Sequence, residues 1–193
     1  MDKRAIGARA LRMRGWTIVG EPPPPDPVVV MIGAPHTSNW DLFLMLWLSW
    51  SYGVEPRFLM KKEAFKGPAG PLMRSLGGIS VDRSNPAGIV DDLIAHAGTA
   101  ERFQIVIAPE GTRAKKEYWK SGFYRIAEKA QVPIVLGWND GASMQVGYGP
   151  SFLPSGDLRA DMDRIREFYA DKGGVNPQNK TIARLREEDE PQP

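Results

Sequence analysis

The chain alternates short, uninterrupted apolar runs with segments of helical periodicity, and this alternation constrains its fold more than any other feature. The runs at 28–33 and 103–108 lack the polar-apolar alternation of a half-solvated strand, so they are typical of strands buried on both faces. We predict strands at 28–33, 57–60, 79–81, 103–108, 133–136 and 144–148. We predict helices at 41–52, 87–97, 122–130 and 158–169. Alternating strands and helices predict a single α/β domain with a mostly parallel central sheet flanked by helices.

Charge and composition divide the chain into three parts. The first fourteen residues are basic, and a run of prolines follows at 22–25. We therefore predict a basic amino-terminal segment with a Pro-rich spacer at 1–27, one folded domain at 28–170, and a carboxyl-terminal tail at 171–193. The tail ends in the acidic sequence EEDEPQP, and its end is predicted to be disordered.

The residue types present exclude several classes of function. The chain has no cysteine, which rules out disulfides, thiolate metal sites and a thioester formed on the protein. It has two histidines, so we predict no metal site. The formal net charge of +2, with basic residues that are not interleaved with aromatic ones, argues against nucleic acid as a partner. A serine hydrolase is disfavoured because the sequence has no Gly-x-Ser-x-Gly elbow.

Chemistry is first indicated by His36 and Asp41, which follow the apolar run at 28–33. A histidine beside a carboxylate can remove a proton from an alcohol, and α/β sheets place their sites at the carboxyl ends of strands. Ser38 and Asp41 also have the spacing of a capping box, in which Asp41 would only cap a helix and His36 would only fill a turn. The pair alone fits both interpretations.

Two further apolar runs end in polar residues. The run at 103–108 leads into Pro-Glu-Gly-Thr-Arg at 109–113, and the run at 79–81 leads into Asp82 and Arg83. Each could be purely structural, the first as a β-turn with an ion pair and the second as a surface contact. In a parallel sheet, however, all three runs would deliver their polar residues to the same edge, which favours a common site.

In this order, the segments resemble the successive sequence blocks of the glycerolipid acyltransferase family, which includes the 1-acyl-sn-glycerol-3-phosphate acyltransferases. His36 and Asp41 match its His-x4-Asp block, and residues 109–113 match its Pro-Glu-Gly-Thr-Arg block completely. A glycine-rich block ending in Asp-Arg is matched at 77–83, and a Val-Pro-Ile-Val block at 132–135. The resemblance spans roughly residues 28–140. Two positions depart from it, since Pro35 replaces a common asparagine and Ala108 a common phenylalanine.

The resemblance implies an enzyme that moves a fatty acyl group from a thioester, acyl-CoA or acyl-ACP, to the hydroxyl of a lysophosphatidic-acid-like glycerolipid, with residues 28–170 as the acyltransferase domain. His36 would act as the general base and Asp41 would orient its imidazole. Arg83 and Arg113 would bind the acceptor's phosphate, with Lys61 adding charge. Glu110 would contact a glycerol hydroxyl or hold Arg113, beside Gly111 and Thr112 of the same turn. No cofactor is expected beyond the donor.

The apolar stretch at 42–50 is predicted to form a helix that either lies buried or lines a groove for the acyl chain. It is too short to cross a bilayer, and residues 1–16 lack the apolar region of a secretory signal. We therefore expect a cytoplasmic protein that lies peripherally on the inner face of the cell membrane, where basic residues attract anionic lipid. Two alternatives stay open: another lipid acceptor, such as an aminolipid or a different lysophospholipid, and a non-catalytic lipid-binding protein.

Overall fold

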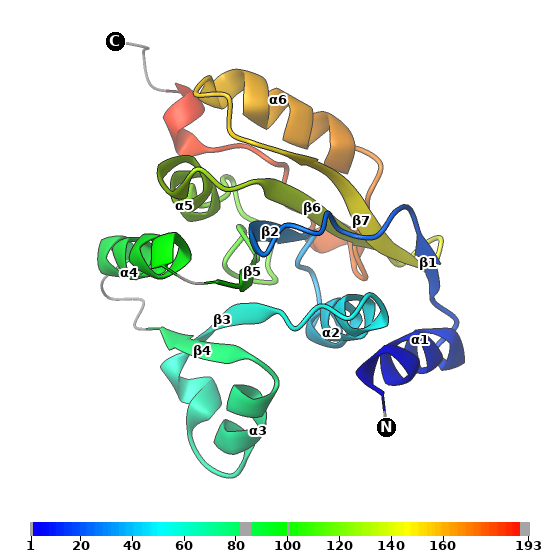
Figure 1. Cartoon of the computed structure of the whole chain (residues 1–193). Helices are drawn as coiled ribbons and strands as arrows, with labels where there is room; N and C mark the ends of the chain where they lie inside the picture. The colour runs from blue at the N-terminus through cyan, green and yellow to red at the C-terminus, as the bar shows by residue number, and fades with distance from the viewer. Residues whose placement is uncertain (1, 82–85, 100, 190–193) are drawn as a thin grey trace.

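The computed structural model describes residues 2–81, 86–99 and 101–189 and contains one sheet of seven strands in these ranges (Figure 1). Its spatial order is β1-β7-β6-β2-β5-β3-β4, and within it the β6–β7 pair is antiparallel whereas the other pairs are parallel. The strands are β1 (Thr17–Val19), β2 (Val28–Ala34), β3 (Arg57–Lys61), β4 (Gly78–Val81), β5 (Phe103–Ile107), β6 (Ile134–Asp140) and β7 (Gln145–Phe152). The prediction of a mostly parallel α/β sheet is confirmed.

Helices cover both faces of this sheet. The α-helices are α1 (Lys3–Met13), α2 (Asp41–Ser51), α3 (Ala69–Ser75), α4 (Pro86–Thr99), α5 (Gly122–Ala130) and α6 (Leu158–Tyr169). Short 3₁₀ helices are η1 (Lys62–Phe65), η2 (Pro177–Asn179) and η3 (Arg186–Asp189). In Figure 1, α1 and α2 lie on one side of the sheet, whereas α4, α5 and α6 lie on the other. The observed bounds of α5 and α6 are those predicted, whereas α3 and β1 were not predicted.

The apolar runs lack alternation because each central strand packs against helices on both faces. In β2, Val30 and Ile32 join a core with α4, α5 and α6, while Val29 and Met31 join a second core with α1 and α2. All four side chains are at most 1% exposed. A strand in this position must be apolar at every residue, and this pattern identified it in the sequence.

The connections that follow the paired strands β2 and β5 run over opposite faces of the sheet. The chain leaves β2 through α2 toward β3 on one side, and it leaves β5 through α5 toward β6 on the other. Adjacent strands whose connections diverge leave a crevice at their carboxyl ends, where ligands bind in open α/β sheets. Because Ile32 pairs with Ile107, the segments after these two strands emerge side by side.

Both ends of the described chain pack against the sheet. Strand β1 pairs with β7, and α1 packs on α2 at Gly7, where a Cβ would lie 2.3 Å from the carbonyl oxygen of Trp47. Near the other end, Leu185 is fully buried and forms a β-bridge with Trp119. The division at residues 27 and 170 stays a prediction, and residues 190–193, whose disorder was predicted, lie outside the described residues. Within the described ranges, no helix is long and apolar enough to cross a bilayer.

Candidate active site

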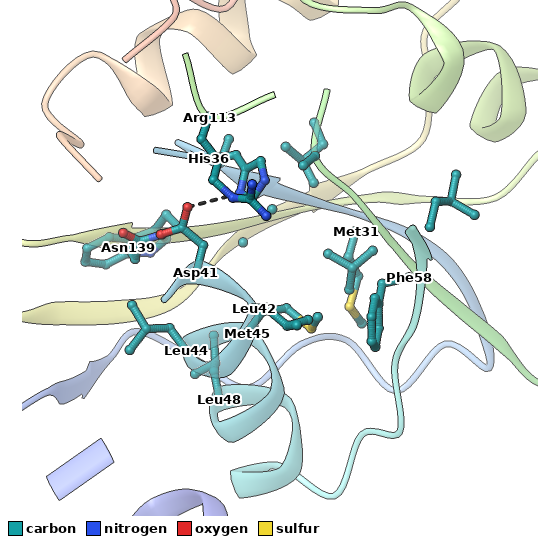
Figure 2. A pocket seen from close by; sticks show the side chains of 18 of the residues that line it. Met31, His36, Asp41, Leu42, Leu44, Met45, Leu48, Phe58, Arg113 and Asn139 are labelled. Carbon is teal, nitrogen blue, oxygen red and sulfur yellow. Dashed lines mark hydrogen bonds and ion pairs between the residues drawn. The ribbon is translucent and has the colours of Figure 1, made fainter. Parts of the chain in front are cut away.

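The chain between β2 and α2 places His36 beside Asp41. Strand β2 ends at Ala34, and the next residues turn into the helix that starts at Asp41. His36 Nδ1 lies 3.0 Å from Asp41 Oδ2, the contact drawn as a dashed line in Figure 2. The His36 side chain is 22% exposed and that of Asp41 is 9% exposed, so the imidazole remains accessible while its partner is buried.

Asp41 also fixes the backbone of this turn. Its Oδ2 accepts hydrogen bonds from the backbone N–H groups of Thr37, at 2.7 Å, and Ser38, at 2.8 Å. The Ser38 hydroxyl in turn accepts from the Trp40 N–H at 3.2 Å. The bond from Ser38 N–H to Asp41 is one half of the predicted capping box, but the Ser38 hydroxyl accepts from Trp40 instead of Asp41, and the regular helix begins only at Asp41. One carboxylate therefore caps the helix and holds the imidazole, so the capping and the catalytic interpretations are compatible.

Glu110 connects the turn after β5 to the turn after β2. Its Oε1 accepts the backbone N–H of His36 at 2.9 Å, and the residue is 4% exposed. Its other oxygen, Oε2, is buried with no hydrogen-bond partner among the described residues. Burial raises the pKa of Glu110 from 4.5 to about 7, although the hydrogen bond from His36 opposes this shift. Glu110 therefore holds the backbone of His36, a contact that was not expected from the sequence, and its expected contact with a glycerol hydroxyl stays a prediction.

Replacing Glu110 with glutamine is expected to remove a pH dependence of stability. Between pH 4.5 and about 7 the folded protein keeps a proton on Glu110 that the unfolded chain has released. The free energy of unfolding therefore has a contribution that is complete below pH 4.5 and is lost as the pH rises to about 7. This contribution amounts to at most about 3 kcal/mol.

Urea unfolding of wild type and Glu110→Gln across this pH range measures the effect. The glutamine keeps an acceptor for the His36 N–H, and its NH₂ at the buried Oε2 position does not titrate, so the difference in how stability changes with pH measures the titration of Glu110. We expect the stability of wild type to fall with rising pH relative to that of the variant. Two stability curves that run parallel through the range would contradict the assignment of this titration to Glu110.

The remaining predicted residues that the structure describes surround the same crevice. The turn after β5 is closed by a hydrogen bond from Gly111 N–H to the Ala108 carbonyl at 3.1 Å, and Gly111 has a positive φ of 65°. Thr112 and Arg113 follow on this turn, and the Arg113 side chain is exposed at its rim near His36 (Figure 2). Lys61 reaches the same crevice from the end of β3. Arg83 lies outside the described residues, so its role stays a prediction.

A cavity of about 390 Å³ opens at the His36–Asp41 pair and continues between α2 and the sheet, and we call it the α2 cavity. Figure 2 shows the apolar side chains of α2 and of β2 and β3 pointing into it. Its deep part is lined by Met31, Leu44, Met45, Leu48, Phe58 and Val146. The apolar helix predicted at 41–52 thus buries part of its apolar surface in the core and presents part of it to a cavity.

Two asparagines that the sequence did not indicate support the turn between β2 and α2. Asn176 donates from its backbone to the Thr37 hydroxyl and from its side chain to the Thr37 carbonyl, both at 3.0 Å. Asn139, on β6, donates a longer bond of 3.4 Å to the Pro35 carbonyl. Asn139 could have been noticed as a polar residue in an apolar strand, but Asn176 lies 139 residues from its partner and no local pattern marks it.

Comparisons with known proteins identify a family and a fold. The profile of the family described as Acyltransferase matches residues 18–136, more than half of the chain. The crystal structure of the 1-acyl-sn-glycerophosphate (LPA) acyltransferase PlsC from Thermotoga maritima is similar, with a TM-score of 0.59 and 19% sequence identity. The similarity covers 84% of this chain and 74% of that chain, and at this identity it supports the fold alone. No curated protein matched the sequence.

Proposed function

This chain belongs to the acyltransferase family, and we propose that it transfers a fatty acyl group from an acyl thioester to the hydroxyl of a lysophosphatidic-acid-like glycerolipid. The proposal depends on one observation: the His36–Asp41 pair lies at the mouth of an apolar cavity. A general base at the mouth of an apolar cavity suits a reaction in which the hydroxyl of one substrate attacks the fatty acyl group of the other.

The contact with Asp41 determines which nitrogen of His36 acts. An ionised carboxylate can only accept, so Nδ1 carries the proton and Nε2 is the basic nitrogen. In the proposed reaction, Nε2 removes the hydroxyl proton as the oxygen attacks the thioester carbon. The carbon–sulfur bond then breaks, and the imidazolium returns the proton to the departing thiolate. Asp41 stabilises the imidazolium between these steps, and no cofactor is required beyond the donor.

The charges at the mouth of the cavity suit a phosphorylated acceptor. Arg113 and Lys61 both line the α2 cavity beside His36, and a guanidinium can bind two phosphate oxygens at once. Arg113 has no carboxylate within 4 Å among the described residues, so its charge is available to a ligand. We include Arg83 in this phosphate site on the sequence resemblance, and we assign the apolar depth of the α2 cavity to the donor's acyl chain.

Product analysis tests this proposal directly. The purified protein is incubated with a panel of acyl-CoA and acyl-ACP donors and a panel of lysolipids, and products are identified by mass spectrometry. Phosphatidic acid from lysophosphatidic acid is the expected product. Acylation of an aminolipid or another lysophospholipid instead would select the alternative acceptor. Release of no CoA and no product with any pair would favour a non-catalytic lipid-binding protein.

We also propose that the protein binds the inner face of the cell membrane through the start of α2. Trp40 and Phe43 are 45% and 41% exposed, although both are large apolar side chains, and their ring centroids lie 5.5 Å apart. The Arg14 guanidinium, at the end of the basic helix α1, lies over the Trp40 ring at 4.6 Å. Aromatic rings beside basic residues are typical of surfaces that meet anionic lipid.

Vesicle binding should weaken when these rings are removed. We expect the double variant Trp40→Ala, Phe43→Ala to bind vesicles that contain anionic phospholipid at least about tenfold more weakly than wild type, because it loses apolar surface that would enter the interface. Co-sedimentation measures this. Leu153→Ala is the matched control, since Leu153 is 60% exposed but lies after β7, away from α1 and α2. Equal binding by all three proteins would contradict the proposed surface.

A further inference from the structure

A second cavity reaches His36 from the opposite face of the sheet. It has a volume of about 800 Å³ and lies between β5 and the helices α4 and α5, and we call it the α4–α5 cavity. The residues that line both cavities are His36, Leu59, Val106, Ala108 and Gly111. The two cavities are therefore separated by the end of β5, and the imidazole lies where they meet.

The walls of the α4–α5 cavity are apolar and incompletely covered. Ile89 and Val90 of α4 are only half-buried, although they pack against the core made with α5. Val90 Cγ2 lies 3.6 Å from the position that a Cβ on Gly122 would occupy, so Val90 faces the start of α5 across a narrow gap. Phe123 and Ile126 form the wall on α5. Folding leaves here an apolar slot suited to a hydrocarbon chain.

The rim of this cavity is positively charged. Lys120 and Arg125 line it, and neither has a carboxylate within 4 Å among the described residues. The Lys120 side chain lies against the turn after β5, with its Cε 3.0 Å from the position of a Cβ on Gly111. At the wall, the Trp119 indole N–H is buried with no partner among the described residues. Arg186 and Glu187 also reach the rim with opposite charges.

We propose that the α4–α5 cavity holds the hydrocarbon chain of the acyl acceptor, whose anionic headgroup lies at the shared turn between Lys120 and Arg113. This inference rests on the proposed function and deepens it, since it assigns the acceptor's hydrocarbon chain to a cavity separate from the one that holds the donor's acyl chain. The donor's acyl chain then occupies the α2 cavity, and the two substrates approach Nε2 of His36 from opposite faces of the sheet.

The reaction itself favours this arrangement over two chains in one cavity. The acceptor oxygen must attack the thioester carbon beside the imidazole, so the two substrates need separate entrances that converge there. A slot with an apolar floor and a cationic rim matches an amphiphile with an anionic headgroup. The α2 cavity, whose depth is lined by apolar side chains, suits the donor's chain.

One substitution in each cavity separates the two chains experimentally. Val90→Trp narrows the α4–α5 cavity, and Met45→Trp, the matched control, narrows the α2 cavity at a side chain that is also half-buried. The acceptors are glycerol 3-phosphate and the hexanoyl, octanoyl and decanoyl lysophosphatidates. Each acceptor is assayed with donors of different acyl length. We measure kcat/KM for each pair.

In wild type, kcat/KM should rise by up to about fourfold for each acceptor methylene that enters the cavity. In Val90→Trp, kcat/KM should no longer rise with the length of the acceptor's chain, while its dependence on donor length stays as in wild type. In Met45→Trp, the dependence on donor length should change, while kcat/KM still rises with the length of the acceptor's chain. If Val90→Trp instead changed the preferred acyl length of the donor, or changed kcat/KM unequally for acyl-CoA and acyl-ACP donors, the α4–α5 cavity would bind the donor and the proposal would be wrong. A cooperative thermal unfolding transition close to that of wild type shows that each variant is folded.

Two measurements keep the inference separable from the proposed function. Gly122→Leu narrows the α4–α5 cavity from the side of α5. It should remove the dependence of kcat/KM on acceptor length as Val90→Trp does, and it replaces Val90→Trp if the Val90→Trp protein folds poorly. Calorimetric binding of decanoyl lysophosphatidate needs no turnover and should weaken in both variants but not in Met45→Trp. Binding that depends on chain length without any transfer would overturn the proposed function and keep the cavity assignment. Binding that is insensitive to Val90→Trp and to Gly122→Leu would overturn the assignment.

Discussion

Replacing His36 with alanine is expected to reduce acyl transfer by about 10³-fold or more, to the background of the assay. The imidazole is the basic group that lies where both cavities meet, and general base catalysis contributes about 10²- to 10⁴-fold to such reactions. The loss should appear in kcat, because the cavities and the cations that bind substrate remain. Steady-state kinetics with acyl-CoA and lysophosphatidic acid measure it.

The other histidine of the chain supplies the control for this experiment. His96 falls in the helix predicted at 87–97 and has no catalytic-looking partner in the sequence, so we interpret it as structural and expect His96→Ala to keep transfer activity. Thermal unfolding shows whether His36→Ala is folded, which we expect because the side chain is partly exposed and its backbone bond to Glu110 does not need the imidazole. A folded His36→Ala enzyme with normal turnover would refute the general-base assignment.

Replacing Asp41 with asparagine is expected to lower kcat by about 10²- to 10³-fold while the turn keeps its shape. The Thr37 and Ser38 N–H groups and the His36 ring all bond to Oδ2, so the amide oxygen of asparagine can take that position and keep all three contacts. What is lost is the negative charge that stabilises the imidazolium. The substitution therefore separates the charge of Asp41 from its role in shaping the turn.

Ser38→Ala is the matched variant for Asp41→Asn. It removes the hydroxyl that accepts the Trp40 N–H but leaves the bonds of Asp41 intact, so it should cost stability and little activity. In Asp41→Asn the new amide NH₂ takes the buried Oδ1 position, which has no hydrogen-bond partner among the described residues, so a loss of about 1–3 kcal/mol of stability is also expected. A folded Asp41→Asn protein with wild-type kcat would contradict the catalytic role of Asp41 and leave it only the role of a helix cap.

Strands with helices on both faces could be predicted from the sequence, and so could the edge strand β4, whereas β1 and α3 could not. Strand β2 is apolar at every residue because it contributes to two cores, and this requirement is visible without coordinates. Strand β1 has three residues at the sheet edge, and α3 has seven residues that include Gly70 and Pro71. Their local preferences are weak, so they depend on tertiary contacts: pairing with β7 for β1, and packing beside η1 and β4 for α3.

The chemistry of the site was likewise predictable where its residues are close in the sequence. His36 and Asp41 are five residues apart, and the caps and turns between them decide their contact locally. The contact of Glu110 could not be predicted, because its partner is a backbone N–H 74 residues away in the sequence. The expected contacts with a hydroxyl or with Arg113 were drawn from side-chain chemistry alone, which does not reveal a backbone partner.

By itself, the sequence determined the class of the fold and the local contact between His36 and Asp41, because the burial pattern and the spacing of these residues can be read along the chain. The tertiary structure decided which segments meet. The pairing of β2 with β5 brings Glu110 under His36, and the divergence of the chain from these strands opens a cavity on each face of the sheet. Cavities form where elements that are distant in the sequence pack incompletely against one another, and a local pattern of residues does not predict where this happens.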